Sequence, residues 1–142
     1  MTITVFENVR LIDPASGRDG VGRLTVEDGR IAAIDSPETP EGACVIDGQG
    51  AVLCPGLVDM RVALGEPGFE YRESVKSGAR AAVAGGITTM AVLPNTSPAI
   101  DHPALVPLLK ARGAETGMVS LPPYGALTRC RRDVGTAPCR GG

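Results

Sequence analysis

The sequence predicts an α/β protein in which a small module of β-strands precedes the first strands of a parallel sheet. Short apolar–polar alternations separated by turn residues occupy residues 1–55. Over residues 56–128, longer apolar runs alternate with amphipathic helical segments, a pattern typical of right-handed βαβ units. The loops after the apolar runs are longer than those before them, so functional residues are expected near 59–66 and 93–98.

The β module is predicted from its turns. Residues 2–12 form the first strand, and residues 23–35 form a hairpin, because Asp28-Gly29 between alternating runs is a strong hairpin signal. Residues 43–56 are expected to form a strand, a glycine-containing turn and a second strand.

The parallel part is predicted from apolar runs at 57–64 and 87–95, with a third run beginning at 118–127. Between the first two runs, a helix over 74–84 is expected to bury one face and to stop at the following glycine pair. That face carries Val75, Ala79, Ala82 and Val83.

A second helix is predicted after residue 100. Asp101 is placed as its N-cap, Pro103 in its first turn and Gly113 at its end.

Composition excludes several function classes. The 142 residues carry 14 Lys+Arg and 16 Asp+Glu, for a net charge of -2, and only two Phe, two Tyr and no Trp. A nucleic-acid binder is therefore not expected. No apolar leader and no membrane-length apolar stretch is present, so a cytoplasmic protein without membrane contact is predicted.

The cysteines do not predict a metal site or a disulfide framework. They lack zinc-ligand spacing and are expected to be reduced, partly buried thiols. Two of them lie in the basic tail 129–142, which departs from the preceding pattern and is expected to be disordered or the product of a frameshift.

Residues 55–101, PGLVDMRVALGEPGFEYRESVKSGARAAVAGGITTMAVLPNTSPAID, carry a family resemblance. They resemble dihydroorotase, a cyclic amidohydrolase of pyrimidine biosynthesis, and the resemblance extends over about 5–127. It implies a metal-dependent (β/α)8 barrel, of which this chain holds only the first three strands, preceded by part of a composite β-sandwich. The chain is therefore expected to be a fragment, either truncated or frameshifted.

The resemblance also locates the family's metal motif. In active members the first barrel strand ends in His-x-His, which binds a divalent metal such as zinc, and an Arg two residues later binds the substrate carboxylate. The matching positions here are Arg61, Ala63 and Gly65. A guanidinium has no free lone pair and alanine has no donor atom, so no metal, no cofactor and no catalytic residue is expected.

Other residues near these positions have two interpretations each. By resemblance Asn95 contacts the substrate, although an Asx turn or loop cap is an alternative. Asp59 is expected to pair with Arg61. Glu66 is predicted to serve loop architecture rather than catalysis, and His102 to be solvated or to cap a turn.

Three functions remain open. The first is a non-catalytic dihydroorotase-like protein of pyrimidine biosynthesis that acts as a structural partner of aspartate carbamoyltransferase, as an oligomer at full length. The second is an active metal-dependent cyclic amidohydrolase of the dihydroorotase, hydantoinase or allantoinase type. The third is a small β domain with an α/β remnant and no function of its own.

Overall fold

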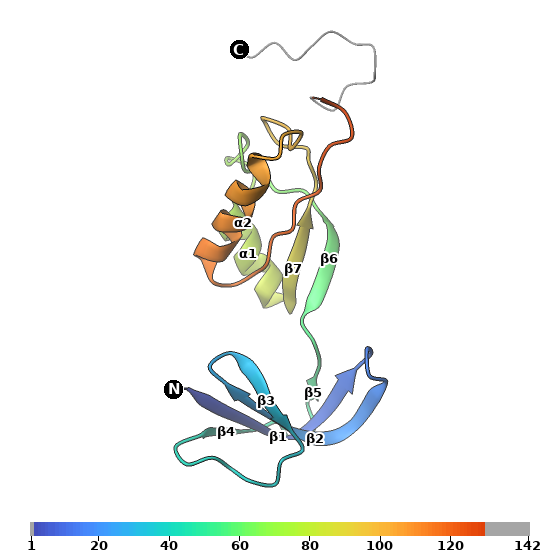
Figure 1. Cartoon of the computed structure of the whole chain (residues 1–142), viewed down its shortest axis with the longest axis vertical. Coiled ribbons are helices and arrows are strands. Elements are labelled where there is room, and N and C mark those ends of the chain that lie inside the picture. The colour runs from blue at the N-terminus through green and yellow to red at the C-terminus, as the bar shows by residue number, and fades with distance from the viewer. Residues whose placement is uncertain (1, 130–142) are drawn as a thin grey trace. The chain divides into compact units, whose positions relative to one another are not determined.

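The computed structural model describes residues 2–129, and the chain divides into two compact units, Met1–Pro55 and Gly56–Gly142 (Figure 1). Residues 130–142, which include most of the expected basic tail and two of the cysteines, lie outside the described residues.

The first unit is a five-stranded sheet in the order β3-β2-β1-β4, with β5 also paired to β1. Strands β1, β2 and β3 form an antiparallel meander, whereas β4 and β5 run parallel to β1. The predicted hairpin is confirmed, since Asp28 and Gly29 form its turn with φ of 46° and 77°. The strands are β1 Ile3–Asp13, β2 Arg18–Glu27, β3 Arg30–Ile34, β4 Cys44–Asp47 and β5 Val52–Leu53.

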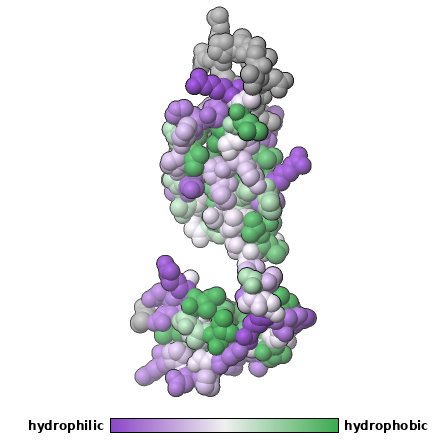
Figure 2. Space-filling model, turned by 45° about the vertical axis from the view of Figure 1, so that its right-hand side comes forward, coloured by the Kyte–Doolittle hydropathy of each residue, from purple (hydrophilic) through white to green (hydrophobic). Residues whose placement is uncertain are grey.

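The buried part of this sheet is small. Val5, Val9 and Leu11 of β1 are buried, together with Thr25 of β2. Much apolar surface stays exposed, and Figure 2 shows apolar side chains gathered on this unit. Ile31 is 64% exposed and borders a hollow of about 460 Å³ that β1, β2 and β3 line.

The second unit contains a parallel βαβ element, as predicted. Strands β6 and β7 pair in parallel, and α1 connects them along the chain (Figure 1). Its elements are β6 Leu57–Val62, α1 Val75–Ala84, β7 Ile87–Val92 and α2 Leu105–Thr116. One apolar cluster joins them, made of Leu64, Val75, Ala79, Ala82, Met90, Val92, Val119 and Leu121.

Helix α1 begins and ends where its sequence signals predict. Ser74 is the N-cap and forms a capping box with Ser77, while Gly85 caps the carboxyl end. The predicted apolar face is correct except for Val83, which is 44% exposed.

Helix α2 differs from the prediction at both ends. Asp101 is not its N-cap: the helix starts at Leu105, and the preceding turn is held by bonds from Leu105 N–H to His102 O and from Val106 N–H to Pro103 O. Gly113 does not end the helix but lies inside it, because the side chain of Leu121 packs against its bare α-carbon.

The third apolar run forms two isolated parallel bridges rather than a strand. Ser120 and Pro123 bridge to β7. The consecutive prolines Pro122 and Pro123 have no N–H to donate, so a continuous ladder cannot form through them.

Candidate functional site

The carboxyl ends of β6 and β7 carry two loops that contact each other. The Leu93 N–H donates to the carbonyl of Val62 at 2.8 Å, and the Ser97 N–H donates to the carbonyl of Pro67 at 2.9 Å. The first bond continues the pairing of β6 and β7, and the second joins the loop after β6 to the loop after β7. The structure therefore brings together the two regions that the sequence singles out as functional.

Glu66 braces the first of these loops. Its Oε2 accepts the Val75 N–H at the start of α1 at 3.0 Å, and its Oε1 lies 3.3 Å from Nε of Arg112 on α2. The carboxylates of Glu115 and then Glu66 raise the pKa of Arg112. These contacts agree with the architectural role expected for Glu66. Nothing in the sequence around Arg112 predicts its contact with Glu66.

The positions that match the family's metal motif do not fit a metal. Arg61 and Ala63 are both exposed at the end of β6. A guanidinium cannot donate a lone pair, and a methyl group offers no ligand. No group of three or more His, Cys, Asp or Glu side chains that could hold a metal ion occurs within residues 2–129.

The expected ion pair between Asp59 and Arg61 is absent from the described part of the chain. Oδ1 of Asp59 instead accepts the backbone N–H of Arg61 at 2.9 Å. The residue spacing of two favours this short side-chain-to-backbone bond, and the exposed guanidinium gains little from an ion pair in water.

Gly65 is buried beneath the loop that follows it. Its N–H donates to the carbonyl of Glu73 at 3.0 Å, and its own carbonyl accepts the N–H of Phe69 at 2.6 Å. Gly65, the position that the resemblance matches to a substrate-binding Arg, is therefore enclosed by main chain in this protein.

An aromatic cluster covers the outer part of the same loop. The guanidinium of Arg72 lies 5.0 Å from the ring centre of Phe69 and 5.4 Å from that of Tyr71, and its Nε donates to the Tyr71 hydroxyl at 3.0 Å. The two rings meet edge to face at 6.3 Å. Nearby, the Gly68 N–H donates to Glu70 and lowers the pKa of that carboxyl.

Asn95 follows β7 and is only partly exposed. Its Oδ1 is buried and has no hydrogen-bond partner among the described residues. The bond that an Asx turn needs is not formed, whereas the neighbouring Thr96 hydroxyl donates to the carbonyl of Pro98 at 2.7 Å. Asn95 thus leaves a free acceptor at this end of the sheet.

The other expected residues lie outside this arrangement. His102 accepts the Ala104 N–H on Nδ1 at 3.2 Å and so caps a turn, one of the two roles predicted for it. Cys44 and Cys54 are free thiols, as expected, but they are exposed rather than partly buried.

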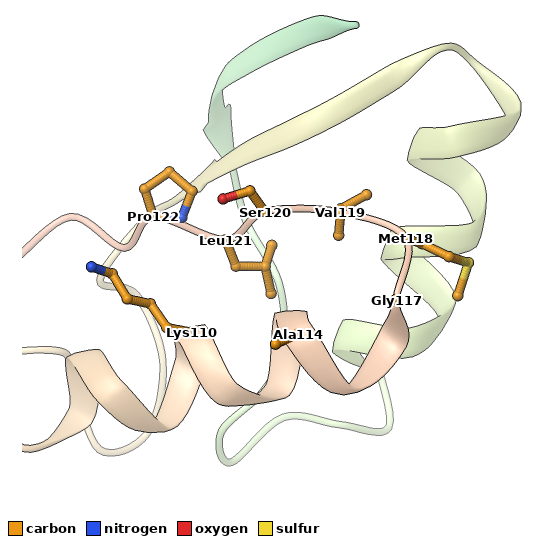
Figure 3. A pocket seen from close by; sticks show the side chains of 8 residues that line it. All are labelled: Lys110, Ala114, Gly117, Met118, Val119, Ser120, Leu121 and Pro122. Atoms are coloured by element: carbon orange, nitrogen blue, oxygen red, sulfur yellow. The ribbon is translucent and has the colours of Figure 1, made fainter. Parts of the chain in front are cut away.

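A hollow of about 650 Å³ lies along the carboxyl half of α2 and the third apolar run (Figure 3). Lys110 and Ala114 line it from the helix, and Val119 and Leu121 from the run. None of its lining residues is one of the predicted site residues. No helix within residues 2–129 is long and apolar enough to cross a membrane.

A family profile described as dihydro-orotase-like matches residues 50–133, more than half of the 142-residue chain. The chain belongs to this family. A dihydroorotase of Pelobacter propionicus is 46% identical over 125 residues, covering 87% of this chain and 30% of the relative. A dihydroorotase-like protein of Pseudomonas aeruginosa is 45% identical over 130 residues, covering 91% of this chain and 30% of that protein.

Among solved structures, the L-hydantoinase of Arthrobacter aurescens superposes with a TM-score of 0.75 at 26% identity, covering 88% of this chain and 28% of that one. The resemblance drawn from the sequence motifs is thereby confirmed, and the amidohydrolase type of the family is supported. The chain spans about 30% of the length of the dihydroorotases that it matches.

Proposed function

We propose that this chain is the amino-terminal part of a dihydroorotase-like protein that does not catalyse metal-dependent ring opening. Residues 56–128 would supply the first strands of an incomplete (β/α)8 barrel. The observation that carries the proposal is the pair Arg61 and Ala63, which stand where active members bind metal and offer no ligand atom.

The proposed role is structural. In this proposal the protein works in pyrimidine biosynthesis in the cytoplasm and associates with aspartate carbamoyltransferase, as an oligomer at full length. Support comes from the scaffold: Glu66 and the Pro67–Ser97 bond hold the loops at the ends of β6 and β7 in place without a metal ligand at Arg61 or Ala63.

Binding to the transferase is the direct test. Purified chain and aspartate carbamoyltransferase are mixed and separated by size-exclusion chromatography with light scattering. A complex that elutes ahead of either protein is expected. Separate elution at micromolar concentrations would contradict the structural role.

Metal content tests the other half of the proposal. After incubation with zinc and dialysis, the chain is expected to retain no stoichiometric zinc and to show no ring opening of dihydroorotate. The matched variant carries Arg61→His and Ala63→His, which restores two imidazoles at spacing i, i+2 on one side of a strand. Zinc bound to the unchanged chain as tightly as to this variant would contradict the assignment.

A second candidate is an active cyclic amidohydrolase with a rearranged site. One observation favours it: the buried, unpartnered Oδ1 of Asn95 could accept an N–H from a cyclic amide. Turnover of dihydroorotate or a hydantoin that Asn95→Ala abolishes without unfolding the chain would establish this candidate over the first.

A further inference from the structure

The loop between β6 and α1 returns to the α-carbon of Gly65 and leaves no room for a side chain. A β-carbon built at this position overlaps the carbonyl oxygen of Phe69 and lies 2.6 Å from that of Glu73. Real β-carbons essentially never approach another atom closer than 3.0 Å. Any residue larger than glycine therefore requires the loop to move.

The obstructing atoms belong to the backbone, and hydrogen bonds hold them in place. The Phe69 carbonyl accepts the Arg72 N–H at 2.9 Å, and the Glu73 carbonyl accepts the N–H of Gly65 itself at 3.0 Å. A flexible side chain could rotate away from a new neighbour, but these carbonyls can move only if the loop gives up its own bonds.

The same loop is also fixed from outside. A β-carbon on Gly68 would overlap the carbonyl of Ser97, and the Ser97 N–H donates to the carbonyl of Pro67 at 2.9 Å. The loop after β7 therefore presses on the loop after β6. Opening the space above Gly65 would disturb both loops.

We propose that Gly65 excludes a carboxylate-anchoring side chain from the end of β6, because its lack of a side chain lets the following loop close over this position. The inference rests on the proposed function and on the resemblance, which matches this position to the family's substrate-binding Arg. It goes further than the proposed function, because the conformation of the loop, and not only the change of residue, would keep a carboxylate-binding side chain away from this position. Restoring the two histidines would then leave the site closed to a carboxylate-bearing ring.

The matched variants are Gly65→Ala and Gly85→Ala in the 142-residue chain. At Gly85 φ is −95°, and the nearest atom to an added β-carbon lies at 3.5 Å, an ordinary contact. We expect Gly65→Ala to lower the Tm, followed by circular dichroism at 222 nm, by about 5 °C or more, and Gly85→Ala to leave it unchanged. Equal Tm values for both variants and the unchanged chain would overturn the proposal.

Amide hydrogen exchange of the unchanged chain provides a readout that does not depend on a variant folding. The N–H groups of Gly65, Phe69 and Arg72 are expected to exchange slowly, because each donates to a loop carbonyl. Exchange at the rate of an unstructured peptide, while α1 stays protected, would show that the loop is open and would overturn the proposal.

Gly65→Arg tests the exclusion itself. The variant combines Gly65→Arg with Arg61→His and Ala63→His. In this chain we expect the loop amides to lose their protection from exchange and titration calorimetry to detect no binding of dihydroorotate. A variant that keeps the loop protected and gains dihydroorotate binding would overturn the proposal. Zinc binding and turnover by the unchanged chain would instead refute the proposed function and leave the Tm and exchange results as they are.

Discussion

The two compact units are stabilised by different means. The β module buries few side chains and carries ion pairs on its surface, such as Arg10–Asp19 and Arg18–Asp35, each at 2.6 Å. The α/β unit is organised around one apolar cluster, and both of its ion pairs within the described residues involve Arg112. Removal of apolar volume should therefore affect the second unit most, and acid should affect the first.

The largest expected effect is the loss of a core side chain from the α/β unit. Leu121 is 2% exposed and packs in the apolar cluster, so Leu121→Ala should cost about 2–5 kcal/mol of unfolding free energy. Urea unfolding followed at 222 nm measures it, because both described helices belong to this unit. The fully exposed Leu127 offers the control, and Leu127→Ala should change the free energy by no more than about 0.5 kcal/mol.

An intermediate effect is expected at the start of α1. Ser74 accepts the Ser77 N–H at 3.1 Å, so Ser74→Ala should cost about 1 kcal/mol in the same urea experiment. Ser120→Ala is the control, because the Ser120 side chain forms no hydrogen bond among residues 2–129. If both serine variants lose the same free energy, the capping box does not stabilise the helix.

A smaller effect is expected from acid, and it should fall on the β module. The hydrogen bond from the Arg18 guanidinium, and to a smaller extent the one from the Arg23 backbone N–H, lowers the pKa of Asp35 below its usual range. A carboxyl whose pKa is lower in the folded state stabilises the fold fully above its unfolded pKa, about 3.9, and loses this contribution as the pH falls further. In the Asp35→Asn variant, the unfolding free energy of the β module should therefore fall less steeply below about pH 4 than in the unchanged protein.

Amide exchange of β1 and β2, recorded from neutral to acid pH, compares the stability of the β module in the Asp35→Asn variant with that in the unchanged protein. Glu38→Gln is the control, since the Glu38 side chain is exposed and forms no ion pair in the described part of the chain. An Asp35→Asn variant with the same pH slope as the unchanged protein would show that the ion pair contributes nothing.

The smallest effect is expected at Arg61. Its guanidinium forms no ion pair within residues 2–129, so Arg61→Ala should leave the Tm unchanged. Arg112→Ala is the matched variant and should lower the Tm, because Arg112 bridges Glu66 at 3.3 Å and Glu115 at 3.0 Å. A clear Tm loss in Arg61→Ala would mean that the arginine replaces a structural charge at the end of β6.

The elements that the sequence predicts well are those whose boundaries are marked by turn or cap residues within or next to them. Strand β3 and helix α1 follow the prediction closely, because Asp28-Gly29, Ser74 and Gly85 act on residues next to them. The family membership could also be read from contiguous motifs. Local signals need no knowledge of the rest of the fold.

The elements that the sequence misplaces depend on distant contacts. Gly113 suggests a helix end until Leu121 is seen against its α-carbon, and the third run looks like a strand until the effect of its prolines on the ladder is considered. Within the site, Arg61 and Ala63 could be placed by resemblance. The closure over Gly65 and the Glu66–Arg112 contact could not, because each depends on how the loop after β6 folds.

The aromatic cluster on that loop gives the protein a spectroscopic reporter of its own. The sequence has no Trp and only two Tyr, so its near-ultraviolet emission arises from tyrosine. Both tyrosines belong to the α/β unit, and Tyr71 lies beside Arg72 and Phe69 on the loop above Gly65. With Tyr124→Phe removing the second source, the emission and anisotropy of Tyr71 would follow the opening of this loop in solution without any attached dye.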